Sequence, residues 1–398
     1  MKRELVSAEC TLVLTLAVIL SLTGLSPSSQ AQTFKVVHNF TNGSDGGYPL
    51  SGLTMDSKGN FYGTTNSGGT YGHGLVFRMN ASGLVTPLYS FTGGKDGAAP
   101  VGGLIVDATG ALYGTTTGGG TYNNGAIFKV MGKTEIVLYS FAGGKDGANP
   151  EAGLAFDAAG NLYGTTSAGG ASGNGTVFRL NAPATKGARW TKTILYSFGT
   201  GTDGAVPVSG VSLDAAGNVY GTTSLGGDAG NGTVFELTKG TAWKETILHY
   251  FQNADDGATP YGGLISDAGG NFYGAATQGG AGGGGTIFEL TPSGTNWNFS
   301  VLYGLPGWGI SGSFRDLMFD TAGNLYGTTH CDGDYTAGTV WELIPSAGSW
   351  TYNQLYDFTG NADGLYSFSN LVLSQGKLYG TTKQGGKYGY GVVFEVAP

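Results

Sequence analysis

Short runs of apolar residues follow one another along most of this chain, separated by turns rich in Gly, Asn and Asp. One unit shows the order clearly, with runs at residues 103–107, 111–116, 125–130 and 135–141. The runs are rich in β-branched and aromatic side chains, which favours strands, and no helical period appears beyond residue 34. The pattern therefore predicts units of four β-strands.

The unit recurs at a regular spacing. A segment built around Tyr-Gly-Thr-Thr has seven copies, 50 to 57 residues apart, which begin at Tyr62, Tyr113, Tyr163, Tyr220, Tyr273, Tyr326 and Tyr379. Repetition at this period is typical of stacked or radial repeats. A parallel β-helix would have shorter rungs, and a sandwich would not repeat so regularly. The sequence predicts an all-β fold, a seven-bladed β-propeller of four-stranded antiparallel blades.

The two ends of the repeat region fit a closed ring. Residues 34–40 align with the outer run of a unit, and residues 391–396 align with the third run. The last blade thus lacks its own outer strand, and the N-terminal strand can supply it, which removes two open sheet edges. We expect residues 36–40 to lie beside residues 392–396, and residues 32–398 to form a single domain.

Residues 1–31 have the pattern of an export signal peptide. Lys2 and Arg3 precede an apolar core at residues 12–22, and small residues follow at 29–31. The apolar core is shorter than the roughly 20 residues that cross a bilayer, so we expect no membrane span. The predicted product is secreted or periplasmic, with association at the cell surface as the alternative.

The net charge limits the classes of binding partner, and the cysteine content limits the possible disulfides. The net charge of −8 argues against nucleic acid and anionic membranes. Cys331 is the only cysteine beyond the predicted signal, so no disulfide within the chain is expected. We expect a monomer.

The repeat consensus Gly-Leu-x-x-Asp-Ala-x-Gly-Asn-Leu-Tyr-Gly-Thr-Thr is followed by Gly-Gly and by Gly-x-Val-Phe-x-Leu. It resembles the GloVer-type extracellular tandem repeat of bacterial exported proteins, and the resemblance extends over nearly all of the chain beyond residue 34. What the resemblance implies is an exported propeller, secreted or at the surface, of largely unassigned function. The chain stops directly after its last predicted strand, which favours free secretion or periplasmic residence over tethering.

Several conspicuous residues recur with the repeat and are interpreted as scaffold. His38 and His249 occupy the position of a tyrosine in the outer run. A ring of carboxylates invites a calcium interpretation, but Asp-Gly followed by Pro is common turn chemistry, so no cofactor or metal is expected. The Asp-Gly-x-x-Pro segments begin at Asp45, Asp96, Asp146, Asp203 and Asp256, and the outer runs of four units begin with Trp190, Trp243, Trp297 and Trp350, expected to pack between blades.

Departures from the repeat indicate where function could lie. One level of the inner strands, expected near the channel mouth, reads Leu50, Val101, Glu151, Val208, Tyr261, Phe314 and Phe368. Arg315 stands among small residues at the next level. The sixth unit departs from the repeat in two loops: its entry loop carries Trp308, and its Gly-Gly loop is replaced by a segment with His330, Asp332 and Asp334. An exposed Trp beside polar groups suits a sugar ring. The candidate ligand-binding residues are Trp308, Arg315, Tyr261, Phe314, Phe368 and Glu151.

Three functions remain open. The first is a non-catalytic exported module that binds an extracellular glycan or protein through one loop face, and the lack of a recognisable catalytic motif favours it over an enzyme. The second is a secreted hydrolase or lyase in which His330 is the acid or base, Asp332 or Asp334 orients it or holds a metal, and Arg315 stabilises an anion. The third is a structural surface or matrix protein, in which case the sixth unit has merely diverged.

Overall fold

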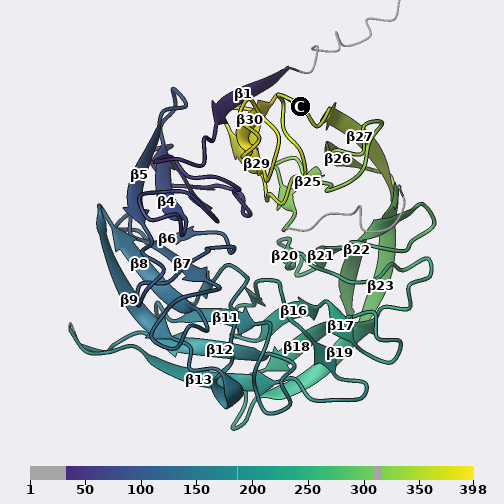
Figure 1. Cartoon of the computed structure of the whole chain (residues 1–398). Coiled ribbons are helices and arrows are strands. Elements are labelled where there is room, and N and C mark those ends of the chain that lie inside the picture. Colours follow the sequence, from purple (N-terminus) through teal and green to yellow (C-terminus); the bar gives the residue numbers. More distant parts are fainter. Residues whose placement is uncertain (1–32, 186, 308–315) are drawn as a thin grey trace, which may run out of the picture.

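The computed structural model describes residues 33–185, 187–307 and 316–398. Within them, seven four-stranded sheets are arranged around a centre (Figure 1), and a small two-stranded sheet joins two loops of one blade. The prediction of an all-β, seven-bladed propeller is confirmed. The predicted signal peptide at 1–31 lies outside the described residues.

Each blade follows the chain from its innermost strand outward, and neighbouring strands are antiparallel. Blade one contains β2 (Thr54–Met55), β3 (Phe61–Thr65), β4 (Leu75–Met79) and β5 (Val85–Ser90); blade two contains β6 (Ile105–Val106), β7 (Leu112–Thr116), β8 (Ala126–Met131) and β9 (Thr134–Ser140). Blade three contains β10 (Ala155–Phe156), β11 (Leu162–Thr166), β12 (Thr176–Asn181) and β13 (Thr191–Ser197); blade four contains β15 (Ser212–Leu213), β16 (Val219–Thr223), β18 (Thr233–Thr238) and β19 (Lys244–Tyr250).

The remaining blades follow the same order. Blade five contains β20 (Ile265–Ser266), β21 (Phe272–Ala276), β22 (Gly283–Ser293) and β23 (Asn296–Pro306); blade six contains β24 (Met318–Phe319), β25 (Leu325–Thr328), β26 (Thr339–Ser346) and β27 (Ser349–Asp357). Blade seven contains β28 (Val372–Ser374), β29 (Lys377–Thr382), β30 (Val392–Val396) and β1 (Phe34–Asn39). The short pair β14 (Gly204–Ala205) and β17 (Leu225–Gly226) and the 3-10 turn η1 (Gly144–Asp146) lie in the connections.

The N-terminal strand completes the last blade. Strand β1 pairs antiparallel with β30, with Phe34 opposite Val396 and Val36 opposite Phe394. A second link crosses the same junction, because the Thr381 hydroxyl donates a hydrogen bond of 2.8 Å to the Ser51 carbonyl of blade one. Ring closure therefore joins the two ends of the chain, as the alignment of the end segments predicted.

The four residues of the repeated motif have four different structural roles, which blade two illustrates. The Tyr113 hydroxyl donates to Asp107 (3.0 Å) in the first turn, and Gly114 leaves room for the ring of a phenylalanine on the next strand. Thr115 donates to the Ala152 carbonyl of blade three (2.8 Å), whereas Thr116 donates to the Gly118 carbonyl in its own blade (3.1 Å). The motif thus fixes one blade internally and ties it to the next.

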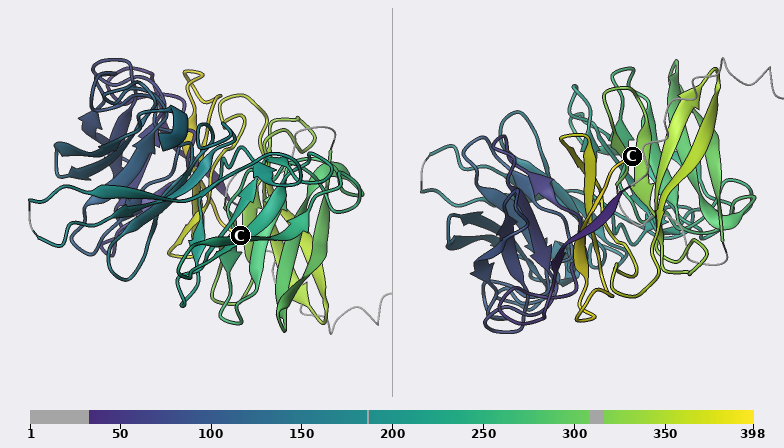
Figure 2. Two further views of the ribbon diagram at one scale, coloured as in Figure 1. Left: turned by 90° about the horizontal axis from the view of Figure 1, so that it is seen from below. Right: turned by 90° about the horizontal axis from the view of Figure 1, so that it is seen from above.

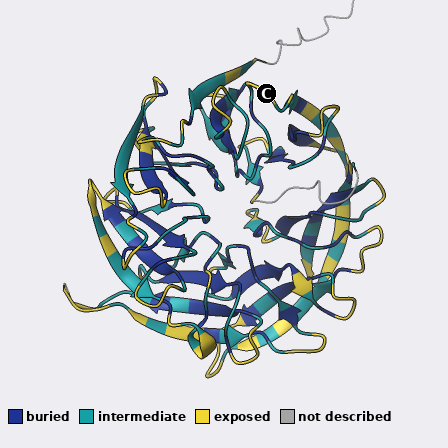
Figure 3. Ribbon diagram, viewed as in Figure 1, coloured by how far each residue is buried: buried dark blue, intermediate teal, exposed yellow. Residues whose placement is uncertain are grey.

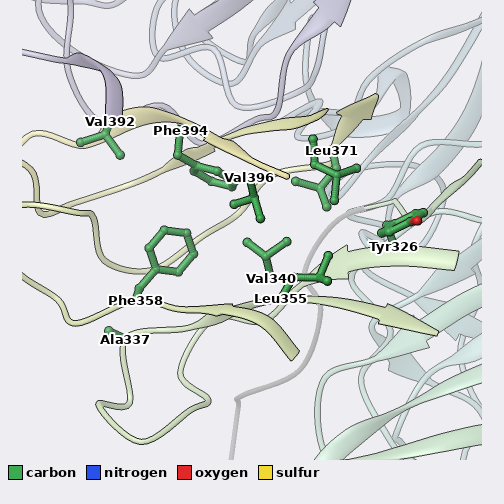
Figure 4. Close-up of a cluster of buried hydrophobic side chains, with 10 residues drawn as sticks. Tyr326, Ala337, Val340, Leu355, Phe358, Leu371, Val392, Phe394 and Val396 are labelled. Atoms are coloured by element: carbon green, nitrogen blue, oxygen red, sulfur yellow. The ribbon is translucent and has the colours of Figure 1, made fainter. Parts of the chain in front are cut away.

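The hydrophobic core is divided into seven clusters, each shared by two neighbouring blades. In the cluster of Figure 4, Val340, Leu355 and Phe358 of blade six pack against Phe394 and Val396 of blade seven. Burial is greatest along the middle strands and falls on the outer strands and the turns (Figure 3). Because no cluster belongs to one blade alone, a blade lacks a complete core until its neighbours are in place.

The recurring Trp and His residues belong to this scaffold. The Trp350 ring meets Tyr273 of the preceding blade edge-on at 6.4 Å, and Trp190 meets Tyr113 in the same way at 6.5 Å. His249 bonds to Asp256 (3.0 Å) where the equivalent tyrosine, Tyr139, donates to its own aspartate (2.7 Å). The interpretation of these positions as packing residues is confirmed. In the described part of the chain, no helix is long and apolar enough to span a membrane.

Candidate functional site

One face of the ring is built from two sets of connections, and we call it the loop face. The first set joins the outer strand of one blade to the inner strand of the next, and the second set joins the second and third strands of a blade. The two sets are bridged to each other, for example between Ala98 and Gly118 and between Ala148 and Ala168. The side views in Figure 2 show loops gathered at the ends of the strands.

A cavity opens at the centre of this face, and we call it the channel mouth. Its volume is about 300 Å³. Lys383 lines it together with six of the seven residues that the alignment of the inner strands put at one level. These six are Leu50, Val101, Glu151, Val208, Tyr261 and Phe368. The sequence had therefore aligned the inner strands correctly, and the charged and aromatic members of the set face one space.

Lys383 was missed as a candidate, although the repeat contained a signal for it. It follows the Tyr-Gly-Thr-Thr motif directly, at a position that holds Asn, Ser or Thr in the first five blades and His330 in the sixth. In blades two, four and five the hydroxyl at this position donates to a loop carbonyl, as Thr117 does to that of Ala99 (2.9 Å). Lys383 has no hydroxyl for that bond, and its ammonium lies 5.4 Å from the centre of the Phe368 ring.

His330 lies beside the channel mouth among aromatic rings. Its imidazole is 4.4 Å from the Phe368 ring and 4.5 Å from the Tyr366 ring, between ring centres. Burial, with a smaller contribution from the positive charge of Lys383, lowers the pKa of His330 to about 4. The imidazole is consequently neutral near pH 7 and too weakly basic for efficient proton abstraction at that pH.

Opposite charges stand on different blades around the mouth. Glu151 accepts a hydrogen bond of 2.7 Å from Ser167, which fixes its carboxylate at the rim. Burial raises the pKa of Tyr261, and the nearby Glu151 carboxylate adds to the rise, so the phenol keeps its proton. The mouth therefore offers a carboxylate, an ammonium, a phenol and aromatic faces to a bound molecule.

A second cavity of about 230 Å³ continues below the mouth and shares Tyr261 with it. Its walls are mostly the small residues and backbone of the inner strands, together with Asp316 and Asn370. Asp316 accepts a hydrogen bond from the Gly263 amide (2.6 Å), and Asn370 donates to the Leu53 carbonyl (3.3 Å). These two side chains thus join neighbouring inner strands where the other blades have glycine.

Asp332 and Asp334 belong to a turn that is held by the outer strand of blade six. The Asp334 amide donates to the Asp357 carboxylate (2.8 Å), while Asp332 is only 6% exposed and accepts from the Gly333 amide (2.8 Å). Burial raises the pKa of Asp332, and Asp357 adds to the rise. Across residues 33–185, 187–307 and 316–398, no hydrogen bond joins His330 to either aspartate. The candidates Trp308, Phe314 and Arg315 lie outside the described residues.

The carboxylates of the Asp-Gly turns are used within their own loops. Asp96 accepts hydrogen bonds from the Thr92 amide (2.7 Å) and the Tyr89 hydroxyl (2.9 Å). The equivalent Asp146 accepts from the Ala142 amide and from Tyr139, both at 2.7 Å. No group of three or more His, Cys, Asp or Glu side chains that could hold a metal ion occurs in the part of the chain that the structure describes.

The sequence and the fold both have known relatives. The profile of the Gloeobacter/Verrucomicrobia repeat matches residues 24–228 and 209–398. Among solved structures, a proposed 6-phosphogluconolactonase from Bacteroides fragilis is similar, with 18% identity, a TM-score of 0.52 and coverage of 83% of this chain and 87% of that one. One from Bacteroides uniformis has 15% identity, a TM-score of 0.51 and coverage of 83% and 88%. At such identities the likeness shows a shared propeller fold alone. Curated proteins gave no match.

Proposed function

The chain belongs to the Gloeobacter/Verrucomicrobia repeat family, and from that premise we propose that it is an exported, non-catalytic propeller that binds a saccharide unit at the channel mouth. Export rests on the signal-like pattern of residues 1–31. The single observation that carries the binding role is the unequal lining of the mouth. The seven blades are built alike, yet the mouth is lined by Glu151, Tyr261 and Lys383 together with aliphatic residues and Phe368.

The chemistry of the mouth suits a sugar better than a purely apolar ligand. Tyr261 and Phe368 offer aromatic faces to the C–H face of a sugar ring, while Glu151 and Lys383 can bond to hydroxyl groups around its edge. A cavity of about 300 Å³ is at the small end of the range for ligand sites. One sugar residue, free or at the end of a chain, is therefore the expected occupant.

The hydrolase alternative has weaker support. Its proton-transfer group would be His330, whose pKa of about 4 leaves it a poor base near neutral pH. Of its two candidate orienting carboxylates, Asp332 accepts a hydrogen bond from the Gly333 amide within its own turn, and the backbone amide of Asp334 ties that turn to Asp357 at the end of β27. We therefore propose that the protein is a monomer that binds its ligand without turning it over and without a metal ion. Size-exclusion chromatography tests the monomeric state, and its repetition with a chelator tests whether a metal ion is needed.

The test is a screen of the purified protein against an array of mono- and oligosaccharides, followed by titration calorimetry on the best binder. Replacing Tyr261 or Phe368 by Ala is expected to weaken binding about tenfold or more, since each removes a stacking face. Met131→Ala, at an exposed turn outside the mouth, is the matched control. Full affinity in both mouth variants would place the site elsewhere, and release of a cleaved sugar would refute a non-catalytic role.

A further inference from the structure

Among the residues that the structure describes, four tyrosines are conspicuously exposed. Their exposed fractions are 58% for Tyr71, 59% for Tyr122, 60% for Tyr335 and 48% for Tyr388. All four occupy the same place, the loop between the second and third strands of a blade, on the loop face. We call this set of four the tyrosine arc.

The arc covers four consecutive blades across the point where the ring closes. Tyr335 belongs to blade six, Tyr388 to blade seven, Tyr71 to blade one and Tyr122 to blade two. The third strands of these blades, β26, β30, β4 and β8, follow one another around the ring in Figure 1. The equivalent position holds Ser172, Ala229 and Gly282 in blades three, four and five.

The scaffold does not need these rings. In blade one the loop around Tyr71 is closed by a backbone bond from Gly74 to Gly68 (3.1 Å), and in blade three the equivalent bond from Gly175 to Gly169 (2.8 Å) forms without any tyrosine. A half-exposed ring contributes little to folding, because most of its apolar surface stays in water. The repetition of exposed tyrosines on one side of the propeller thus points to contact with another molecule.

Exposed lysines outnumber exposed carboxylates on the loops of the arc. Lys387, Lys95 and Lys145 are exposed there against the single exposed Asp334 beside Tyr335, whereas Asp228 and Asp255 are exposed on the loops of blades four and five. The Lys387 ammonium lies 5.2 Å from the centre of the Tyr388 ring. A chain with a net charge of −8 therefore gathers exposed cations beside its exposed rings.

Lys95 is held between two loops of the arc. Its loop contacts blade one through the bond from Ala99 to the His73 carbonyl (2.9 Å) and blade two through the bond from Gly120 to the Gly94 carbonyl (2.9 Å). It therefore lies between the loops that carry Tyr71 and Tyr122. A ligand that follows the arc meets a ring, a cation and a second ring in order.

We propose that the tyrosine arc binds a linear acidic polysaccharide, a chain of uronic acid residues laid along the rim of blades six, seven, one and two. Each exposed tyrosine is flanked by small or polar residues, namely Thr and Gly at Tyr71, Thr and Asn at Tyr122, Asp and Thr at Tyr335, and Lys and Gly at Tyr388, unlike the contiguous apolar patch of a protein interface. Sugar rings present apolar faces that can stack on single tyrosines. The carboxylate of a uronic acid is attached at the ring edge, where it can reach a lysine while the face stays free to stack.

This binding surface is separate from the channel mouth and does not require it. A polymer with a repeating unit matches a protein surface that repeats from blade to blade, which a short peptide or a single small molecule does not. The equivalent loop position of blades three to five holds no tyrosine, which limits the polymer to one side of the propeller and gives it a defined path.

The experiment is affinity electrophoresis of the purified protein in gels that contain polygalacturonate. We expect strong retardation of the wild type and a loss of about three- to tenfold in apparent affinity for each of Y71A, Y122A, Y335A and Y388A. The matched control is L225A, which removes an exposed apolar side chain (48%) from the same face on blade four. Thermal unfolding of every variant checks that the fold is intact.

The charge is tested with K95Q, K145Q and K387Q, compared with K133Q on the turn between β8 and β9. The first three should each weaken retardation, and fully methyl-esterified polygalacturonate should bind at least tenfold less. Equal retardation of the wild type and the quadruple Tyr variant would overturn the proposal, as would polyglutamate bound as tightly as polygalacturonate. Y261A should leave the retardation unchanged, so failure here is distinguishable from failure at the channel mouth.

Discussion

Gly114 and Phe128 face each other across β7 and β8 so closely that no other residue fits at the glycine. A Cβ added to Gly114 would lie 2.6 Å from Cζ of Phe128, far inside normal contact distance. The same relationship recurs in every blade, with Trp341 in place of phenylalanine in blade six. The glycine of the repeated motif is therefore required by a ring on the neighbouring strand.

We expect Gly114→Ala to destabilise the protein by about 1–3 kcal/mol, because the added methyl group overpacks a filled core. Urea denaturation measures the change. Gly103→Ala is the matched control, since a Cβ there meets no atom within 4 Å, and it should be close to neutral. A smaller loss for Gly114→Ala in a Phe128→Leu background than in the wild type would show that the phenylalanine ring is the cause, while an undiminished loss would assign it to the second close neighbour, Cδ2 of Leu104 at 2.8 Å.

Lys192 forms a buried ion pair at the junction of blades two and three. Its side chain is 3% exposed, and Nζ lies 2.8 Å from Oδ1 of Asp146. We expect Lys192→Met to cost about 2–4 kcal/mol, because Asp146 would lose its counter-charge in a partly desolvated place. The exposed Lys244→Met is the control. A loss equal to that of the control in denaturant titrations would show that the pair contributes nothing.

At two other blade junctions the position of Lys192 is held by a glutamate, which again lies beside the aspartate of an Asp-Gly turn: Glu135 beside Asp96, and Glu245 beside Asp203. Burial, together with Asp96, raises the pKa of Glu135 to about 7, and burial with Asp203 raises the pKa of Glu245 to about 8. The Tyr196 hydroxyl lies within hydrogen-bonding distance of both Glu245 (3.1 Å) and Asp203 (3.0 Å). The folded state therefore holds protons that the unfolded state releases near pH 4.5.

Stability should accordingly fall as the pH rises from about 4.5 to 8 and level off above that. The expected size is on the order of 1 kcal/mol per site after allowance for solvent screening. Melting temperatures of the wild type and of the double variant Glu135→Gln, Glu245→Gln, taken between pH 5 and 9, measure it. The double variant should lose the slope, and a slope that persists in full would exclude these two glutamates as its source.

Phe34 anchors the closing strand to the neighbouring blade. Its ring stacks on Tyr356 with 3.8 Å between centres and meets Phe358 edge-on. We expect Phe34→Ala to destabilise the protein by about 2–3 kcal/mol, somewhat less than for a fully buried phenylalanine. Amide exchange in β30 should rise most, because β1 covers its edge. Ile136→Ala, half exposed on β9, is the control, and unchanged exchange in β30 would contradict the anchoring role.

The local sequence was sufficient to predict the fold, because each blade repeats the same turns and the same pattern of buried residues. The Asp-x-x-Gly turn, the alternation of apolar residues and the glycine opposite an aromatic ring are all readable within 50 residues. Even the closing strand was readable, since residues 34–40 match an outer run that the last unit lacks. The alignment of inner strands likewise predicted that Glu151, Tyr261 and Phe368 share one level.

Other features of the site depended on distances that no local pattern contains. Lys383 and His330 follow the motif in different blades, and only their common approach to the Phe368 ring makes them part of one mouth. Asp332 and Asp334 were grouped with His330 because they are close in sequence, yet Asp332 accepts from its own turn and the Asp334 amide bonds to Asp357 of β27. The tyrosine arc could not be predicted from the sequence either, because the exposure of a side chain is a property of the folded loop.

The sequence by itself determined the number of blades, the order of strands and the closure of the ring, since these follow from short-range turns and from burial patterns that repeat. Only the tertiary structure decided which side chains share the channel mouth and which tyrosines stay in water. The reason is geometric: a closed ring brings residues from blades hundreds of positions apart to one axis or one rim, and contacts of that kind leave no periodic trace in the chain.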